Sequence, residues 1–242
     1  YAPALGLGIA ERAGYSAMFL VAFAICLAGL AMALFVKYPA YQPKKDHFKF
    51  KNLFEISSIP ASVNFLITII TTGGLTAFIA IYARERGGYN IGAFFTISAV
   101  GGIISRWVAG LIFNKRGPRE ILLTGLLMPI AGFLLLAYVK DAWGFYTASA
   151  LFGMCSGILY LSFQTMVNNL VATQRRGAAN ATLFTIINLG LGKLITGFLA
   201  DSIGFDYTFL LYAGVNVLSI VFFMTITLKH YKNNISKVNN IN

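Results

Sequence analysis

The chain has 242 residues, of which 57% are hydrophobic and 11% charged, and its formal net charge is +11. A water-soluble domain has about a quarter charged residues, so this composition excludes an ordinary soluble fold. The basic residues lie between apolar runs and form no aromatic-interleaved patch, so the charge predicts contact with a lipid bilayer and no nucleic-acid partner.

Apolar runs long enough to cross a membrane follow one another along the chain. About 20 apolar residues are needed to span roughly 30 Å of hydrocarbon. Such runs are predicted at 15–36, 59–83, 91–113, 120–139, 142–165, 178–200 and 207–228. The predicted fold class is therefore all-α, a polytopic membrane helix bundle with seven spans.

The links between these runs differ in charge, which predicts the orientation of the chain. Most of the 19 Lys and Arg residues lie in four segments, 37–51, 115–119, 175–176 and the tail that begins at 229. All four segments would share one side of the bilayer, and basic segments remain in the cytoplasm. We therefore expect a multi-pass protein of the plasma or inner membrane, with the start of the chain outside and the C-terminus cytoplasmic.

An internal repeat predicts a symmetric organisation. A shift of 87 residues places Arg106, Gly110, Asn114 and Gly117 onto Lys193, Gly197, Asp201 and Gly204. Three spans lie within that shift, so the two copies cross the bilayer in opposite directions. This is the inverted repeat found in many secondary transporters.

The link at 110–119 reads Gly-Leu-Ile-Phe-Asn-Lys-Arg-Gly-Pro-Arg and resembles the G-x-x-x-D-R/K-x-G-x-R signature of major facilitator superfamily transporters. We interpret it as a gating loop. Gly110 is expected to let two helices approach closely and Gly117 to form a tight turn. Lys115 and Arg119 would hold the loop among headgroups. Asn114 stands where the signature has Asp, which removes one charge from any ionic latch.

The segments 175–180 and 197–204 also look like late segments of this family. The resemblance implies that 1–36 is the end of the N-terminal transporter half, with a stub of helix five and helix six. It implies that 37–58 is the central cytoplasmic loop, 59–228 the C-terminal six-helix bundle and 229–242 a cytoplasmic tail. The stub is similar to the end of the G-P-x-x-G signature of drug and proton antiporters. We therefore expect a fragment whose partner, most of the N-terminal half, is missing.

Two cations, Arg106 and Lys193, lie inside predicted spans. Each would cost about 3 kcal/mol at the centre of a bilayer, so each needs a partner or water. Either cation could face a central cavity and attract an anionic group of a substrate. The alternative is that both side chains snorkel toward an interface about 12 Å away.

Uncharged polar residues that share helix faces complete the predicted substrate cavity. They are Asn64, Thr68, Thr71 and Thr72 in the run 59–83, Tyr160 and Gln164 in 142–165, and Asn188 in 178–200. Residues at these spacings lie on one face of a helix. The alternative for each is a hydrogen bond between helices, worth about 0.6 kcal/mol on average.

The sequence predicts no enzyme, no metal site and no cofactor, because His47 and His230 lie in links without partners and no carboxylate lies deep in a span. The resemblance implies a secondary active transporter that exports small amphipathic or organic solutes by alternating access, with protons as a coupling ion. One alternative is an uptake symporter or facilitator for a polar metabolite, favoured if both intramembrane cations face a water-filled cavity. Another is a seven-helix membrane receptor.

Overall fold

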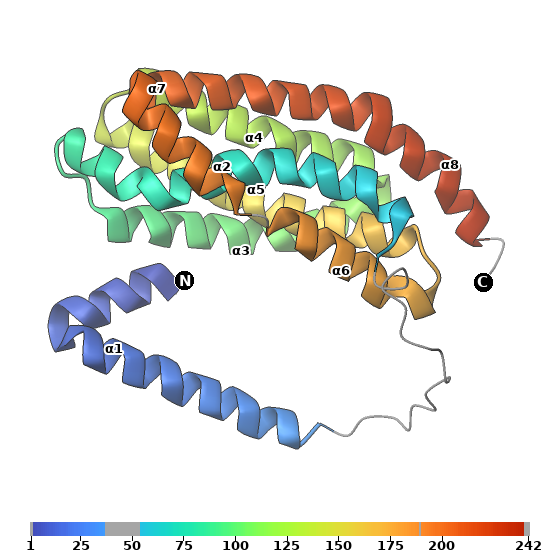
Figure 1. Ribbon diagram of the computed structural model, residues 1–242, viewed down its shortest axis with the longest axis horizontal. Coiled ribbons are helices and arrows are strands. Elements are labelled where there is room, and N and C mark those ends of the chain that lie inside the picture. The colour runs from blue at the N-terminus through green and yellow to red at the C-terminus, as the bar shows by residue number, and fades with distance from the viewer. Residues whose placement is uncertain (1, 37–53, 189, 240–242) are drawn as a thin grey trace. The chain divides into compact units, whose positions relative to one another are not determined.

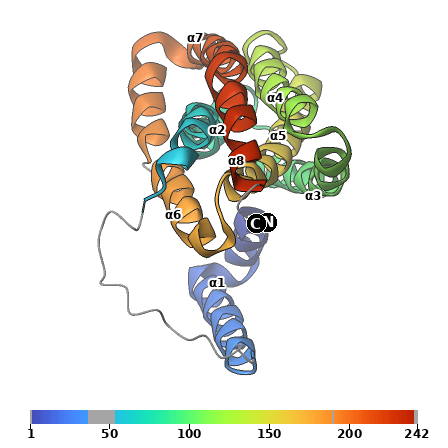
Figure 2. The same cartoon turned by 90° about the vertical axis from the view of Figure 1, so that its right-hand side faces the viewer.

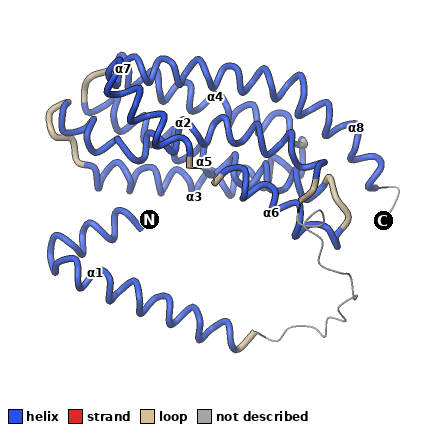
Figure 3. The backbone as a smooth tube through the Cα atoms, in the orientation of Figure 1, coloured by secondary structure: helices blue, strands red, loops and turns tan. Residues whose placement is uncertain are grey.

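The computed structural model describes residues 2–36, 54–188 and 190–239, and every regular element in these ranges is helical (Figures 1 and 3). The chain divides into two units, 1–49 and 50–242. Within these described ranges, six helical stretches are long and apolar enough to cross a membrane. The prediction of an all-α membrane helix bundle is therefore confirmed.

The first unit consists of helix α1, Ala2–Leu34, which bends at Gly14. Gly14 has φ 80° and ψ 166°, so a short helix precedes the bend and a longer one follows it. A candidate membrane span, Arg12–Leu34, begins just before the bend and covers the longer part. The predicted stub and the first predicted span thus correspond to the two arms of α1.

The second unit is a bundle built from seven helices among the described residues. They are α2 (Ile59–Glu85), α3 (Ile91–Arg116), α4 (Pro118–Tyr138), α5 (Ala142–Asn169), α6 (Arg176–Ile187), α7 (Leu191–Phe222) and α8 (Leu228–Asn239). Helices α2 and α5 pack against most of the others and form the middle of the bundle (Figure 2). A π-helical turn, Phe223–Thr227, joins α7 to α8.

Local sequence explains where the helices begin and end. The side chains of Asn90 and Asp141 accept hydrogen bonds from the backbone N–H groups of Ala93 and Gly144, which caps α3 and α5 at their first turns. Gly117 separates α3 from α4 with φ 79° and ψ −176°. A positive φ is costly for a residue with a Cβ, so glycine suits this turn. The tight turn predicted at Gly117 is confirmed.

The same backbone conformation recurs at the matching position of the internal repeat. Gly204, inside α7, has φ 80° and ψ 165°. The last candidate span covers 63 residues, Thr173–Ile235, far longer than the roughly 20 residues of a single crossing. Because α7 reverses at Gly204 and returns along α4 (Figure 1), this stretch contains both of the last two predicted runs.

Close helix packing occurs at glycines, although not at the one expected in the gating loop. A Cβ at Gly153 of α5 would overlap the carbonyl oxygen of Ser98 on α3, and a Cβ at Gly157 would overlap Ser105 Oγ. At Gly110, by contrast, a Cβ would meet only Leu161, at 4.0 Å. The close approach expected at Gly110 is therefore wrong for the described residues, because α3 crosses α5 nearer its middle.

Two core clusters fill the bundle at different heights. One contains Phe65, Phe163 and Phe223 and extends to α8. The other contains Phe133, Phe145 and other aromatic side chains near the α2–α3 and α4–α5 loops. We call the end of the bundle that holds residues 115–119, 173–176 and 228–232 the basic end.

Candidate functional site

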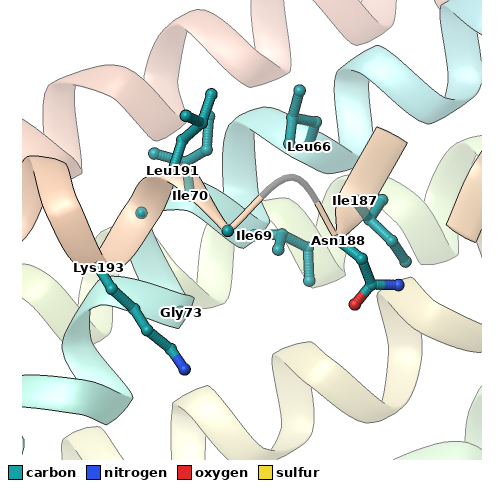
Figure 4. A pocket seen from close by; sticks show the side chains of 10 residues that line it. Leu66, Ile69, Ile70, Gly73, Ile187, Asn188, Leu191 and Lys193 are labelled. Atoms are coloured by element: carbon teal, nitrogen blue, oxygen red, sulfur yellow. The ribbon is translucent and has the colours of Figure 1, made fainter. Parts of the chain in front are cut away.

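A pocket of about 270 Å³ lies where the predicted span 178–200 is interrupted (Figure 4). Helix α6 ends at Ile187, Gly190 adopts a left-handed conformation with φ 70°, and α7 begins at Leu191. The break divides one apolar run into two half-helices. Its lining residues come from α2, α6 and α7 and are Leu66, Ile69, Ile70, Gly73, Ile187, Asn188, Gly190, Leu191, Gly192 and Lys193.

Two predicted cavity residues, Asn188 and Lys193, line this pocket together. In Figure 4 their side chains point to the same side of the break, away from Leu66 and Leu191. Lys193 is exposed, and Asn188 donates a hydrogen bond to the carbonyl oxygen of Phe184 at 2.8 Å. The pocket thus combines a cation, an amide and an apolar wall.

A tight crossing of α2 and α7 fixes the position of Lys193. A Cβ at Gly192 would overlap the carbonyl oxygen of Ile70, and a Cβ at Gly74 would overlap Thr196 Oγ1. The backbone on either side of Lys193 is therefore held against α2 without intervening side chains. Gly190, the N-cap of α7, makes no side-chain cap hydrogen bond, and the positive end of the helix dipole lies beside Lys193.

Aromatic side chains connect α5 to this region. The ring of Tyr160 packs edge-on against Phe65 of α2 and tilted against Phe184 of α6, with centroid distances of 5.9 Å in both pairs. Gln164, one turn further along α5, is half-buried. Neither residue lines the pocket, so they remain candidates beside it.

The structure places the polar face of α2 against α7. Asn64 Nδ2 donates to the carbonyl oxygen of Ser219 at 2.9 Å, and Asn216 Nδ2 donates to Thr71 Oγ1 at 3.0 Å. Thr68 Oγ1 lies 3.4 Å from Ser219 Oγ. These side chains are almost fully buried within the bundle.

This polar face therefore joins α2 to α7 and does not face open space. Hydrogen bonding between helices was the alternative that the sequence left open for these residues. Thr72 is half-buried and donates to the carbonyl oxygen of Thr68 within α2. Sequence reasoning missed the partners Asn216 and Ser219, although both interrupt the apolar run 207–228.

Arg106, the other cation predicted inside a span, is exposed on α3 and does not line the pocket with Lys193. It lies two residues from both Ile104 and Val108, which are also exposed. Two residues turn a helix by about 200°, so Arg106 lies on the opposite side of α3 from these two. In the gating loop, Arg119 is exposed, whereas the side chains of Asn114 and Lys115 lie outside the described part of the structure.

Polar contacts at the basic end join the start of α2 to α6 and α8. Arg175 Nε donates to Glu55 Oε2 at 2.6 Å, and the backbone N–H of Glu55 donates to Thr182 Oγ1 at 2.8 Å. His230 Nε2 lies 3.0 Å from the carbonyl oxygen of Ser57. Although burial raises the pKa of Glu55, hydrogen bonds from Arg175 and Ser57 outweigh that effect, and the net pKa lies below 4.5.

We expect this contact to be lost in acid. A carboxyl group with a lowered pKa stabilises the fold above its ordinary pKa of 4.5, and the stabilisation disappears as the pH falls through the lower folded value. At neutral pH, Glu55→Gln should lower the free energy of unfolding by about 1 kcal/mol, since Arg175 is half exposed. Melting temperatures measured against pH should converge for the two proteins below pH 4.5. An equal difference in melting temperature at every pH would contradict this expectation. Asp201→Asn, which neutralises an exposed carboxylate, is the control.

A second ionic cluster lies at the opposite end and was not predicted. Arg86 forms an ion pair with Asp206, and Lys140 Nζ lies 3.3 Å from Asp206 Oδ2. The hydrogen bond to Asp206 raises the pKa of Arg86 further, against the effect of burial. This cluster joins the ends of α2 and α4 to the segment of α7 after Gly204. Its members lie in three separate links, so sequence spacing gave no signal for it.

Comparison with known proteins identifies similar chains. The sequence model of the Major Facilitator Superfamily matches residues 1–192 and, in a second match, 142–239. The "Multidrug resistance protein MdtG" of Citrobacter koseri is 23% identical over 236 residues, which cover 91% of this chain and 58% of that protein. An "Uncharacterized MFS-type transporter" of Pseudomonas aeruginosa is 30% identical over 155 residues, which cover 62% of this chain and 38% of that one. The chain thus spans 58% of the length of the MdtG relative.

Proposed function

The chain belongs to the Major Facilitator Superfamily, and we propose that it contributes to the export of small amphipathic or organic solutes by alternating access. The family consists of secondary transporters, so its match argues against the alternative of a seven-helix receptor. Export is favoured because one relative is a multidrug resistance protein.

The pocket at the break between α6 and α7 carries this proposal. Transporter substrates bind near the middle of the membrane, where discontinuous helices present their ends. Here the break follows the 12 residues of α6, and the pocket holds Asn188 and Lys193 beside an apolar wall. An amphipathic solute would place its apolar part on Leu66 and Ile69 and its anionic or polar part toward Lys193.

We also assign the parts of the chain within a whole transporter. Residues 1–36 belong to the end of the N-terminal half, 37–58 to the central loop, 59–228 to the C-terminal six-helix bundle and 229–242 to the tail. The N-terminal half is the partner against which the bundle rocks. We place any proton-coupling carboxylate in that half, because the runs 59–83, 91–113, 142–165 and 178–200 contain no Asp or Glu.

We propose that the basic end faces the cytoplasm, as basic loops do. A cysteine replacing the exposed Arg119 should then react with membrane-impermeant maleimide only after cells are opened. A cysteine replacing the exposed Lys140, at the opposite end, should react in intact cells. The reverse pattern at both positions would invert the proposed orientation.

Transport in cells and vesicles tests the function. Cells that express the full-length protein should extrude an anionic amphipathic dye such as carboxyfluorescein faster than cells without it. Extrusion should stop when the proton gradient is collapsed. If purified protein in vesicles moves neither carboxyfluorescein nor cationic ethidium down any imposed gradient, the proposal fails.

Lys193, the exposed cation in the pocket, also favours a second candidate, uptake of a polar anionic metabolite by a symporter or facilitator. Counterflow in vesicles separates the two directions. Accumulation of a labelled organic acid on the inside, driven by an inward proton gradient, would support uptake and oppose export.

A further inference from the structure

A groove of about 330 Å³ opens between α3 and α4, separate from the proposed substrate pocket. One wall is the stripe Ile104, Val108 and Ile112 on α3, and the floor is formed by Met154 and Ile158 of α5. Ile104 and Val108 are 57% and 45% exposed, so the groove is open to the surroundings of the bundle.

The groove exists because α3 and α4 pack on α5 and hardly on each other. Gly153 and Gly157 bring α5 close to α3, and a Cβ at Gly125 of α4 would lie 2.6 Å from Leu159 Cδ2 of α5. Two helices drawn onto one neighbour in this way leave a gap between themselves. The turn at Gly117 closes that gap at the basic end.

The position of the groove restricts what can occupy it. Ile104 and Ile112 lie within the candidate membrane span Ile91–Phe113. They are eight residues apart, so the stripe is about 12 Å long, running inward from the basic end. The hydroxyl of Thr124, on the α4 wall, already donates to the carbonyl oxygen of Glu120. The occupant must therefore be apolar along most of its length.

The charge at the closed end suits a phosphate group. Residues 115–120 carry three cations and one carboxylate, a net charge of +2. Arg119 is exposed at the first turn of α4, one residue before Glu120, which lines the groove. A guanidinium group binds phosphate oxygens with two parallel hydrogen bonds.

From the apolar groove and the cationic turn at its end, we infer that this site binds one phospholipid, with an acyl chain between α3 and α4 and its phosphate at Arg119. The acyl chain would cover the exposed faces of Ile104 and Val108. Arg106 lies on the opposite side of α3, and the proposed substrate pocket is lined by α2, α6 and α7, so the lipid and the substrate would occupy separate sites.

Photolabelling tests the site in the unmodified full-length protein. The protein is reconstituted into vesicles of phosphatidylglycerol with a diazirine in one acyl chain, and labelled peptides are identified by mass spectrometry. Labelling should be several-fold higher in the segments 104–112 and 120–128 than in 215–222 of α7, which also has exposed apolar residues. Equal labelling of all three segments would overturn the inference.

A matched pair of variants gives a second measurement. Val108→Trp should fill the groove and reduce the phospholipid retained after detergent purification, measured by native mass spectrometry. Val221→Trp, at a valine of α7 that is 53% exposed and outside the groove, should retain as much as the wild type. Arg119→Gln should lower retention without blocking the groove. If Val108→Trp folds with the same melting temperature and keeps its lipid, or if both tryptophan variants lose it equally, the site is wrong.

Discussion

Replacing Gly153 by alanine is expected to destabilise the bundle by about 3 kcal/mol, the upper part of the range for overpacked cores. A single Cβ at this position would overlap the carbonyl oxygen of Ser98 and lie 2.7 Å from its Cα. Because backbone cannot rotate away as a side chain can, α3 and α5 would have to separate. The melting temperature of the full-length protein in detergent should fall, and its yield from membranes should decrease.

Gly214 provides the control for this change. It lies in α7, has ordinary helical φ, and a Cβ there would meet no heavy atom within 4 Å. Gly214→Ala should therefore leave the melting temperature unchanged or slightly raised, because alanine is the better helix former. Equal losses for both variants would mean that glycine content, and not the α3–α5 crossing, determines stability.

Much of the fold follows from apolar runs and a few glycines. Each predicted run is helical over most of its described residues, and Gly117 and Gly204 turn the chain as the repeat indicates. The end of α6 at Ile187 and the new start of α7 at Leu191 were not predicted, because apolar residues continue on both sides and only Asn188 and Gly190 mark the break. Hydropathy measures transfer to lipid and is insensitive to one unwound turn.

Helix α8 was also missed, since the tail from 229 reads as polar. Its signal was the spacing of Leu228, Tyr231 and Ile235 at i, i+3 and i+7, which places them on one face. That face packs on the core cluster at the basic end. A short amphipathic helix of this kind gains its stability from the bundle and little from its own propensity.

The candidate site was predicted only in part. Asn188 and Lys193 were selected separately and share one pocket. The spacing of Asn64, Thr68 and Thr71 correctly puts them on one face of α2, but periodicity cannot say which neighbour that face meets. The neighbour is α7, where Asn64 Nδ2 donates to the carbonyl oxygen of Ser219 and Asn216 Nδ2 donates back to Thr71, although the amide oxygens of both asparagines are buried without a partner among the described residues.

Replacing Lys193 by methionine is expected to reduce transport of anionic solutes at least tenfold, which corresponds to about 1.4 kcal/mol. Methionine keeps an unbranched apolar stem and removes the charge that the pocket presents beside Asn188. Lys193→Arg should retain most activity, since the charge stays. Uptake of carboxyfluorescein into vesicles, measured against concentration, should show the loss mainly as a raised KM, as expected when a binding interaction is removed.

Two comparisons separate an electrostatic role of Lys193 from a structural one. Lys232 is an exposed lysine of α8 at the basic end, and Lys232→Met should transport normally. A neutral solute of similar size should lose little transport with Lys193→Met, because only an anion gains from the cation. If transport of the anion is unchanged, Lys193 snorkels to an interface and does not contact substrate. If neutral and anionic solutes are affected equally, Lys193 supports the α2–α7 crossing, and the substrate must be recognised elsewhere.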